Sequence, residues 1–525
     1  MYGTKRSVFA TPDARATLAS SRRTARRDSN LRVFHSRRET KNTSKNSTRN
    51  YLMPQTLSGD PAVSHQPFES DLASELSGES MMLGTQRVNE QGHLEIGGCD
   101  AIELAEQYGT PLYVMDEAHI RDTMRAMTRA LRARHQQTQV IYASKAFPCL
   151  AIARIVAQEG LMIDVASAGE LFTALRADFP PERIVFHGNN KSRDELEMAV
   201  RAHIGRIIVD NENELDVLDE VARSLDATQK IMLRLTPPVD PHTHRYISVG
   251  KTDTKFGMNI EGGAAMQGLK KALQKEHLEV TGVGCHIGSQ ILDADFFKLS
   301  ARIMCEFLAS ARDELGVTFP DLDLGGGLGI RYLPEHAPPS FDDYAQAVVG
   351  TVKGHCARLN LDVPRLYVEP GRALVGEAGT TLYRVGGIKR IPDIRTYVAV
   401  DGGISDNPRP ALYEARYNAL NANRAGEEAR ELVTIAGKHC ETDTLIEDTL
   451  IAPLETDDIV AVQSTGAYNH AMSSNYNRFR RPAVVLVRDG QSDIIIERET
   501  LQDLLSHDLV PGRLRPDSAS ENGHQ

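Results

Sequence analysis

The 525-residue sequence has neither a long apolar run nor a paired cysteine motif, and each absence excludes a class of protein. No stretch approaches 18 uninterrupted apolar residues, which argues against a membrane-spanning helix. The six cysteines are scattered, without a CxxC pair or a spacing typical of metal ligands. We therefore expect reduced thiols, a cytoplasmic location, no association with a membrane and no bound metal.

Acidic residues outnumber basic ones outside the first 50 positions. Residues 1–50 hold 13 Lys or Arg and 3 Asp or Glu, a net charge of +10, so about −21 falls on the remaining 475 residues. An acidic body argues against nucleic acid as a partner. The basic head lacks apolar periodicity, which predicts a disordered extension over residues 1–80. A plastid transit peptide has the same composition, so a plastid location stays open.

Eight short apolar runs alternate with amphipathic stretches between residues 117 and 375. One of the amphipathic stretches begins at Ser192, which forms a capping box with Glu195. Strands that alternate with helices predict a closed parallel (β/α)8 barrel. The eight runs end, in order, at Lys145, Ser167, Asn189, Asp210, Leu235, Ile287, Gly327 and Gly371.

A different pattern follows residue 375. Runs such as TLYRV, TYVAVDGG and AVVLVRDG come at hairpin-like spacing and predict a second, mostly antiparallel β domain over residues 376–510. The strand-like PLYVMD, within residues 81–116, is expected to join that domain or to lead into the barrel. Residues 511–525 form a polar tail.

Polar and glycine-rich residues follow the barrel strands directly, at the end where barrels carry their active sites. Lys145 in YASKAF is either a lysine that reaches solvent or a Schiff-base lysine. The glycines of residues 325–327 form a tight turn or let backbone N–H groups approach a phosphate. Glu369, in the string EPGR, could keep a heteroaromatic nitrogen protonated. Together, these groups predict pyridoxal phosphate as the cofactor.

Ten strings in order carry a resemblance that runs from about Pro111 to Pro482. They are YASKAF, DVASAGEL, FHGNNKS, HTHRYISVGKTDTKFG, CHIGSQ, LDLGGGLGIRY, EPGR, DGGISDNPRPALY, GKHCE and GAYNHAMSSNYN. On these strings the sequence resembles the alanine-racemase-like, fold type III decarboxylases that use pyridoxal 5'-phosphate, and among them the diaminopimelate decarboxylases.

The resemblance implies decarboxylation of meso-2,6-diaminopimelate to L-lysine and carbon dioxide, the last step of lysine biosynthesis. The alternative is a decarboxylase of the same fold that acts on ornithine, arginine or lysine. A catalytically silent relative is disfavoured, because Lys145, the glycines and Cys440 are all present.

The resemblance also implies a role for each matched residue. Lys145 and Cys440 would be catalytic. The cofactor would be bound by Lys145, His286, Ser289, Gly325, Gly326, Gly327, Glu369, Gly371 and Tyr468. The amino-acid substrate would be bound by Arg372, Arg409, Tyr413, Glu441 and Tyr468. Cys440 and Glu441 would come from the partner subunit of a homodimer with shared active sites.

Two positions depart from the family pattern. Relatives usually carry His two residues before the stacking histidine, where this sequence has Gly284. The family pattern Cys-Glu-Ser-Gly/Ser-Asp is here Cys-Glu-Thr-Asp-Thr, so the acid that pairs with the lysine of KFG across the dimer interface has moved to Asp443. Whether Asp443 replaces that acid opposite Lys255 is open at this point.

Overall fold

The structure, a computed structural model, describes residues 81–240 and 253–515. The predictions made for residues 1–80 and 516–525 lie outside these ranges, as does part of the HTHRYISVGKTDTKFG string. The residue boundaries given above for the domains stay predictions.

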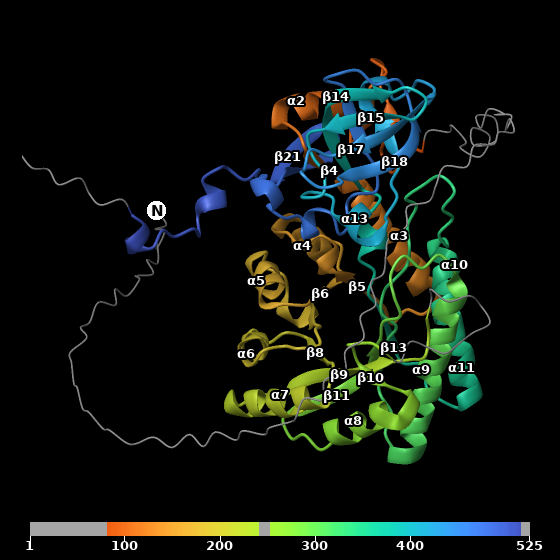
Figure 1. Ribbon diagram of the computed structural model, residues 1–525. Coiled ribbons are helices and arrows are strands. Elements are labelled where there is room, and N and C mark those ends of the chain that lie inside the picture. Colours follow the sequence, from red (N-terminus) through yellow and green to blue (C-terminus); the bar gives the residue numbers. More distant parts are fainter. Residues whose placement is uncertain (1–80, 241–252, 516–525) are drawn as a thin grey trace, which may run out of the picture. The chain divides into compact units, whose positions relative to one another are not determined.

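Eight parallel strands close into a barrel, as the alternation of strands and helices predicts (Figure 1). Each strand pairs with the next along the chain, and β13 pairs with β5 to close the ring. A two-residue strand, β10 (Met258–Asn259), pairs with β9 beside the ring. The eight are β5 (Thr138–Ala143), β6 (Met162–Val165), β7 (Ile184–Phe186), β8 (Arg206–Val209), β9 (Gln229–Thr236), β11 (Leu278–Cys285), β12 (Asp321–Asp323) and β13 (Arg365–Val368).

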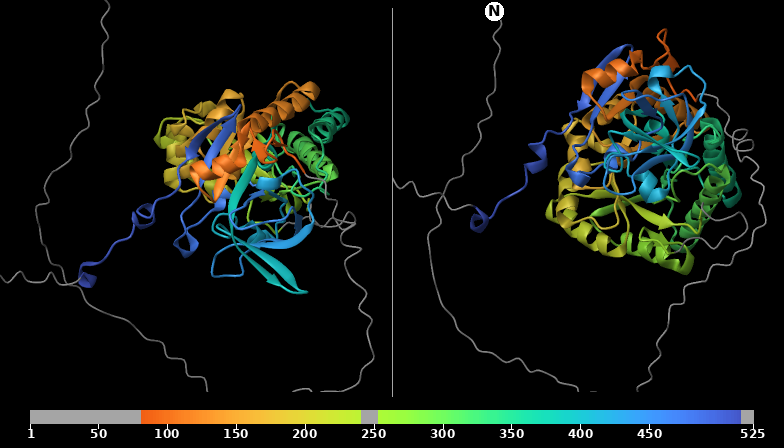
Figure 2. Two further views of the ribbon diagram at one scale, coloured as in Figure 1. Left: turned by 90° about the horizontal axis from the view of Figure 1, so that it is seen from above. Right: turned by 45° about the horizontal axis from the view of Figure 1, so that its top comes forward.

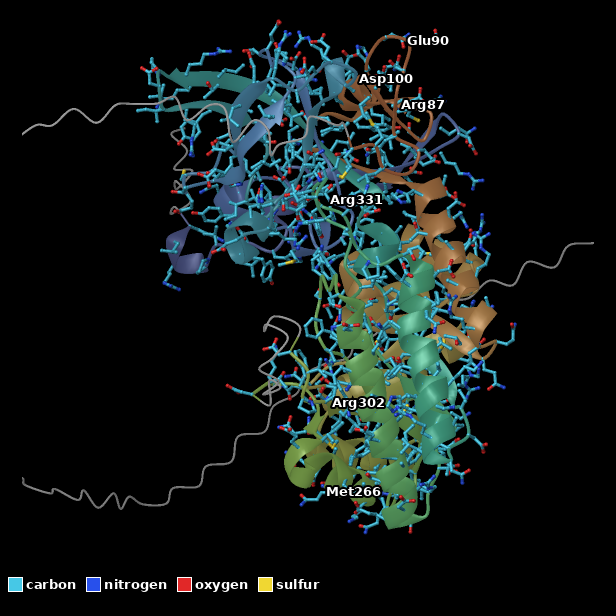
Figure 3. The ribbon with its side chains drawn as sticks, turned by 90° about the vertical axis from the view of Figure 1, so that its right-hand side faces the viewer. Arg87, Glu90, Asp100, Met266, Arg302 and Arg331 are labelled. Atoms are coloured by element: carbon cyan, nitrogen blue, oxygen red, sulfur yellow. The ribbon has the colours of Figure 1, made fainter. Side chains whose placement is uncertain are left out.

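Helices on the outside cover the barrel with their apolar faces. On α9 (Ala294–Leu315), Ala301, Met304 and Leu308 are buried at helical spacing, and Arg302 on the opposite face pairs with Glu306. Figure 3 shows Arg302 on this outer face and Met266 on the neighbouring α8. The other helices are α3 (Glu117–Arg134), α4 (Leu150–Gln158), α5 (Ala168–Arg176), α6 (Arg193–Arg201), α7 (Glu212–Ser224), α8 (Ala264–Ala272), α10 (Phe341–Ala345) and α11 (Thr351–Leu359).

Local signals explain where several of these helices begin. The predicted capping box is confirmed at α6: the Ser192 hydroxyl accepts from the backbone N–H of Glu195, and the Glu195 carboxylate accepts from that of Ser192. Asp116 and Asn211 cap α3 and α7 in the same way with their side chains. These caps fix where α3, α6 and α7 begin after the preceding strands.

The amino end of the barrel is filled by packed side chains. Tyr367 lies within an apolar cluster of buried residues from six strands. Arg206, at the start of β8, donates to the Tyr367 hydroxyl at 2.9 Å and lies 3.2 Å from the Asp321 carboxylate. Because this end is closed, the polar residues of the carboxyl end face the accessible mouth of the barrel.

The second part of the chain is a mostly antiparallel β domain. Its sheet has the order β18-β17-β15-β14-β4-β20-β21, and a further strand, β19 (Ile459–Val462), pairs with β14 and with β16 (Ala419–Asn421). The sheet strands are β4 (Leu112–Asp116), β14 (Gly379–Ile391), β15 (Arg395–Val400), β17 (Glu431–Ala436), β18 (Thr444–Ile451), β20 (Ala483–Arg488) and β21 (Gln491–Ile496).

The segment before the barrel contributes to this domain, as predicted. β4, the PLYVMD strand, pairs antiparallel with β14 and parallel with β20. A small sheet of β1 (Arg87–Val88), β2 (Leu94–Ile96) and β3 (Cys99–Asp100) precedes it and leads into α2 (Ala101–Tyr108). Figure 3 shows Arg87 and Asp100 at the end of the β domain that lies away from the barrel helices.

The β domain returns to the barrel mouth through the loop after β19. The backbone N–H of Tyr468 donates to the carbonyl of Ala146, next to Lys145, at 2.8 Å. Figure 2 (right) shows the cyan and blue β domain in front of the ring of barrel helices. No helix of residues 81–240 and 253–515 has the length and apolar character that crossing a membrane requires.

Candidate active site

Lys145 lies at the mouth of the barrel, in the turn η1 (Ser144–Ala146) that follows β5. Its side chain is accessible to solvent, although protein atoms surround it on several sides. Desolvation by these atoms lowers the pKa of Lys145, but electrostatic interactions with Asp164, Tyr468 and Glu369 outweigh it, so the pKa is raised. The lysine therefore stays protonated in the free protein.

Two buried carboxyl groups and a half-buried histidine meet beside Lys145. Asp164 lies in β6, His187 and Glu369 follow β7 and β13, and each offers an atom within 4.8 Å of the others. Burial raises the pKa of Asp164 to about 6, and burial lowers the pKa of His187 to about 4. Burial also raises the pKa of Glu369, although Lys145 and Arg234 oppose that shift.

Glu369 and His187 each keep a polar atom without a hydrogen bond. The distance from His187 Nε2 to Glu369 Oε1 is 2.5 Å, short enough for an ion pair. The two atoms are poorly aligned for a hydrogen bond, and hydrogen bonds weaken steeply with misalignment, so neither buried atom is satisfied by the other. Two buried polar atoms that face the mouth without partners are expected where a ligand normally supplies them.

Asp323, at the end of β12, lies next to Glu369. Burial, followed by the negative charge of Glu369, raises the pKa of Asp323 well above its usual range. Its carboxyl group also accepts a hydrogen bond from the backbone N–H of Gly325 at 2.8 Å. Two adjacent carboxyl groups share one negative charge here, and Asp323 is the one that holds the proton.

The three glycines after β12 are required by close backbone contacts. A Cβ on Gly326 would lie 2.0 Å from the carbonyl oxygen of Glu369, and one on Gly325 would lie 2.3 Å from that of Cys285. Gly325 and Gly327 also have positive φ angles, of 67° and 109°. The glycines thus let the ends of β11, β12 and β13 approach one another. This is a second reason for glycine here, in addition to the approach to an anion that the sequence suggests.

His286 is oriented by this glycine turn. Its Nδ1 accepts a hydrogen bond from the backbone N–H of Gly326 at 3.2 Å, which places the ring proton on Nε2. Burial, together with the positive charges of Lys145 and Arg234, lowers the pKa of His286 well below its usual range. The ring is therefore neutral and fixed in orientation beside Lys145.

Two buried arginines converge on one hydroxyl group. The guanidinium of Arg409 donates to Tyr332 at 2.7 Å and to Tyr417 at 2.9 Å. Arg372 donates to the same Tyr332 hydroxyl and, at 2.9 Å, to that of Ser289. Within the described ranges, no carboxylate lies at ion-pair distance from either guanidinium. Because buried charges are normally paired, this arrangement is typical of an anion-binding site.

Tyr468 and Gly371 complete the mouth. The Arg372 guanidinium lies over the Tyr468 ring, 4.7 Å from its centroid, and burial raises the pKa of the Tyr468 hydroxyl. Gly371 begins the short helix α12 (Arg372–Val375), where a Cβ would lie 2.9 Å from that of Ala143. Gly371 thus brings Arg372 close to β5, the strand that precedes Lys145.

The remaining predicted residues are not among these contacts. Tyr413, at the end of α13 (Arg409–Tyr413), is 63% exposed. Cys440 and Glu441 are exposed as well, and their hydrogen bonds go to Asn477 and Tyr476 of the β domain. The structure therefore joins the barrel residues into one site and presents Tyr413, Cys440 and Glu441 on a solvent-facing surface.

The structure shows what surrounds the two positions that depart from the family pattern. Asp443 is buried, and its carboxylate oxygens accept from the backbone of Ile404 at 2.8 Å and contact His439 at 2.5 Å. Its carboxylate is therefore already bonded within its own subunit, which argues against a further contact with Lys255 of a partner. At Gly284, even a Cβ would lie 2.9 Å from the Cβ of Asp323, so Asp323 occupies the adjacent space.

A pyridine ring with a phosphate group fits these residues. The unsatisfied oxygen of Glu369 can accept from a protonated ring nitrogen, and Lys145 offers an amine beside it. Asp164, His187 and Glu369 could also hold a metal ion, since two oxygens and one nitrogen form a plausible ligand set. Lys145 beside them offers an amine that can form a Schiff base, a group that a metal site does not require, so the arrangement favours the organic ring.

Sequence reasoning did not assign site roles to Asp164, Tyr332 and Tyr417. Asp164 had a signal, because it is a charged residue inside the apolar run LMIDVAS. Tyr332 and Tyr417 had none, since a tyrosine in a loop is common and only the folded chain brings both hydroxyls to Arg409.

Comparisons with known proteins agree with this site. A family model described as "Pyridoxal-dependent decarboxylase, pyridoxal binding domain" matches residues 117–376. The chain is 47% identical to the diaminopimelate decarboxylase of Bacillus subtilis (strain 168) over 427 residues, which covers 81% of this chain and 97% of that protein. It is 45% identical to the diaminopimelate decarboxylase of a Synechocystis strain over 452 residues, 84% of this chain and 96% of that one.

Solved structures show the same likeness. The diaminopimelate decarboxylase of M. jannaschii in complex with L-lysine matches with a TM-score of 0.78 and 38% identity, covering 83% of this chain and all of that one. A lysine/ornithine decarboxylase of Vibrio vulnificus, in complex with putrescine, matches with a TM-score of 0.63. At 21% identity, that second match reports on the fold alone.

Proposed function

Because the chain belongs to the diaminopimelate decarboxylases, we propose roles for its own residues in converting meso-2,6-diaminopimelate to L-lysine and carbon dioxide. The relatives are 42–49% identical over about four fifths of the chain, and the pyridoxal-binding model covers the whole barrel. The reaction depends on pyridoxal phosphate, and it is favoured over decarboxylation of ornithine or arginine.

The barrel residues would hold the cofactor. When bound, pyridoxal phosphate supplies the electron sink for the bonding pair that stays behind on the substrate carbon when carbon dioxide leaves. Glu369 would accept a hydrogen bond from the ring nitrogen, and the protonated Asp323 beside it lets Glu369 keep its negative charge. Lys145 would be the covalent attachment point, and His286 would stack on the ring. The phosphate would be bound by Ser289, Gly325, Gly326, Gly327, Gly371 and Tyr468.

The arginine pair is the observation that carries the choice of substrate. Diaminopimelate has two carboxylates, and only one is lost. The other would be bound by Arg372 and Arg409, with help from Tyr413 and Tyr468. Ornithine and lysine have no second carboxylate, so either would leave two buried guanidinium groups without a counterion. A substrate with a distal carboxylate removes that cost.

Cys440 and Glu441 would act on the active site of a partner subunit in a homodimer. Cys440 Sγ would deliver a proton to the carbon that loses carbon dioxide, and Glu441 would bind the distal amino group. Support comes from their exposed position on the β domain, where their hydrogen bonds go to Asn477 and Tyr476.

An exposed apolar arm also supports the homodimer. After β21 the chain runs away from both domains (Figure 1). Arg478 ties this arm to the loop that contacts Cys440, because it donates to the Leu504 carbonyl at 2.6 Å and to Asp508 at 2.7 Å. Five apolar side chains of the arm are exposed: Leu501, Leu505, Leu509, Val510 and Leu514. A group of exposed apolar side chains is expected to be covered by another surface.

Mixing two inactive variants tests the shared site. Lys145→Ala subunits lack the cofactor lysine, and Cys440→Ala subunits lack the proton donor. A heterodimer of the two has one intact site, so mixed subunits should recover up to about half of the wild-type activity per heterodimer. Verified heterodimers that stay inactive would contradict the proposal that Cys440 acts on the partner's site.

We also propose that the protein works in the cytoplasm. All six cysteines are free thiols, and five of them are buried, as in proteins of a reducing compartment.

A further inference from the structure

The loop that carries Cys440 and Glu441 rests on a buried hydrogen-bonded pair. His439 Nδ1 lies 2.5 Å from Asp443 Oδ2, and both side chains are almost fully inaccessible to solvent. Gly403 and Gly437 make room for the Asp443 carboxylate, since a Cβ on either would lie within 2.0 Å of Asp443 Oδ2. The pair thus holds the base of the loop in place.

Tyr476 lies above this base and reaches Glu441. Its ring stacks on His439 at an interplanar angle of 12° and a centroid distance of 6.0 Å, and Phe479 packs against the edge of the same histidine at 4.7 Å. The Tyr476 hydroxyl donates to Glu441 Oε1 at 2.5 Å. The next residue, Asn477, accepts from the backbone N–H of Cys440 at 3.2 Å.

We propose that Tyr476 is a positioning residue that fixes the carboxylate of Glu441 for the distal amino group of the substrate. This inference rests on the proposed role of Glu441. Glu441 is exposed, so an unrestrained carboxylate would sample several rotamers. The hydroxyl of Tyr476 restrains one oxygen and leaves Glu441 Oε2 for the ligand. The stacked His439, held in turn by Asp443, keeps the tyrosine ring from moving away.

The hydroxyl of Tyr476 can be removed without losing the stacked ring. Tyr476→Phe keeps the packing on His439 and deletes only the bond to Glu441. Tyr108→Phe is the matched control, because its hydroxyl donates to the Ser492 carbonyl at 3.2 Å on another part of the β domain. Glu441→Gln tests the group that Tyr476 is meant to position, and the double variant completes a thermodynamic cycle.

The readout compares two ligands that differ in the distal amino group. L-Lysine, the product, carries an amino group and a carboxylate at its distal end, whereas 6-aminohexanoate lacks that amino group. Calorimetry on the loaded dimer gives the ratio of the two dissociation constants. We expect Tyr476→Phe to reduce the preference for L-lysine about tenfold, the effect of one hydrogen bond to a charged group. The KM for diaminopimelate should rise similarly, while kcat changes much less.

The variants separate failure of this inference from failure of the function on which it rests. If Glu441→Gln loses the preference for L-lysine and Tyr476→Phe keeps it, Tyr476 does not position Glu441 and the inference is wrong. If both variants keep the preference, the proposed role of Glu441 is wrong as well. Additive losses in the double variant would also overturn the inference, because positioning requires that the two effects overlap. Tyr108→Phe should behave as wild type.

Discussion

Replacing Arg409 with methionine should remove most of the activity without unfolding the protein. Arg409 is buried, and its guanidinium donates to Tyr332 and Tyr417. If it also binds the distal carboxylate, its removal leaves that carboxylate in a buried site with half of its counter-charge. Truncating one partner of such a buried charged pair costs about 2–5 kcal/mol. At about 1.4 kcal/mol per tenfold, kcat/KM for diaminopimelate should fall roughly 30-fold to several-thousand-fold.

The folded state should tolerate this change. Tyr332 keeps the bond from Arg372, and Tyr417 keeps a contact with Asn469. The change also relieves the repulsion between two buried positive charges. The unliganded Arg409→Met protein should therefore melt close to the wild-type temperature.

Steady-state kinetics and inhibition together check the reasoning. L-Lysine keeps the distal carboxylate and should lose its inhibition of Arg409→Met, whereas cadaverine lacks that carboxylate and should inhibit both proteins equally. Arg416→Met is the control, because Arg416 is an exposed arginine seven residues away, 3.8 Å from Glu335. Wild-type kcat/KM in Arg409→Met, or an equal loss of inhibition by both amines, would refute the arginine site.

Three further predictions concern Glu369, Asp406 and the apolar arm. The Glu369→Gln protein should still bind the cofactor, which its absorbance reports. Its kcat should be about 10²–10³-fold lower, because the charge beside the ring nitrogen is lost. An unchanged kcat would contradict that role. Burial raises the pKa of Asp406 from its ordinary 3.8 to about 7, so the folded state retains a proton that the unfolded state releases. Stability should therefore fall as pH rises from about 4 to about 7, by up to about 4 kcal/mol, and urea unfolding of Asp406→Asn should show a shallower pH dependence. Ending the chain after Glu499 should weaken the dimer in sedimentation experiments, whereas ending it after Arg515 should not; an unaffected dimer would exclude the arm from the interface.

The barrel and its cofactor were predictable because they depend on local patterns. Alternating apolar runs and capping residues specify the strands and helices, and the closed topology then brings the strand ends together. Lys145 and Glu369 follow different strands, and both face the mouth in the structure, as the strand-end rule predicts.

Contacts between distant segments were not predictable in the same way. The sequence shows an acid at Asp443, but not the direction of its side chain. That direction depends on Gly403, forty residues earlier, whose missing side chain leaves space for the carboxylate. The approach of His187 to Glu369 likewise results from closure of the barrel, which no local pattern encodes.

Product formation by the purified protein with added pyridoxal phosphate tests the central claim most directly. The substrates to compare are meso-diaminopimelate, L-ornithine, L-lysine and L-arginine. We predict that only diaminopimelate is consumed, with one L-lysine and one carbon dioxide formed per molecule. Putrescine from ornithine, cadaverine from lysine or agmatine from arginine, at a rate comparable to that of diaminopimelate turnover, would contradict the substrate that the arginine pair supports.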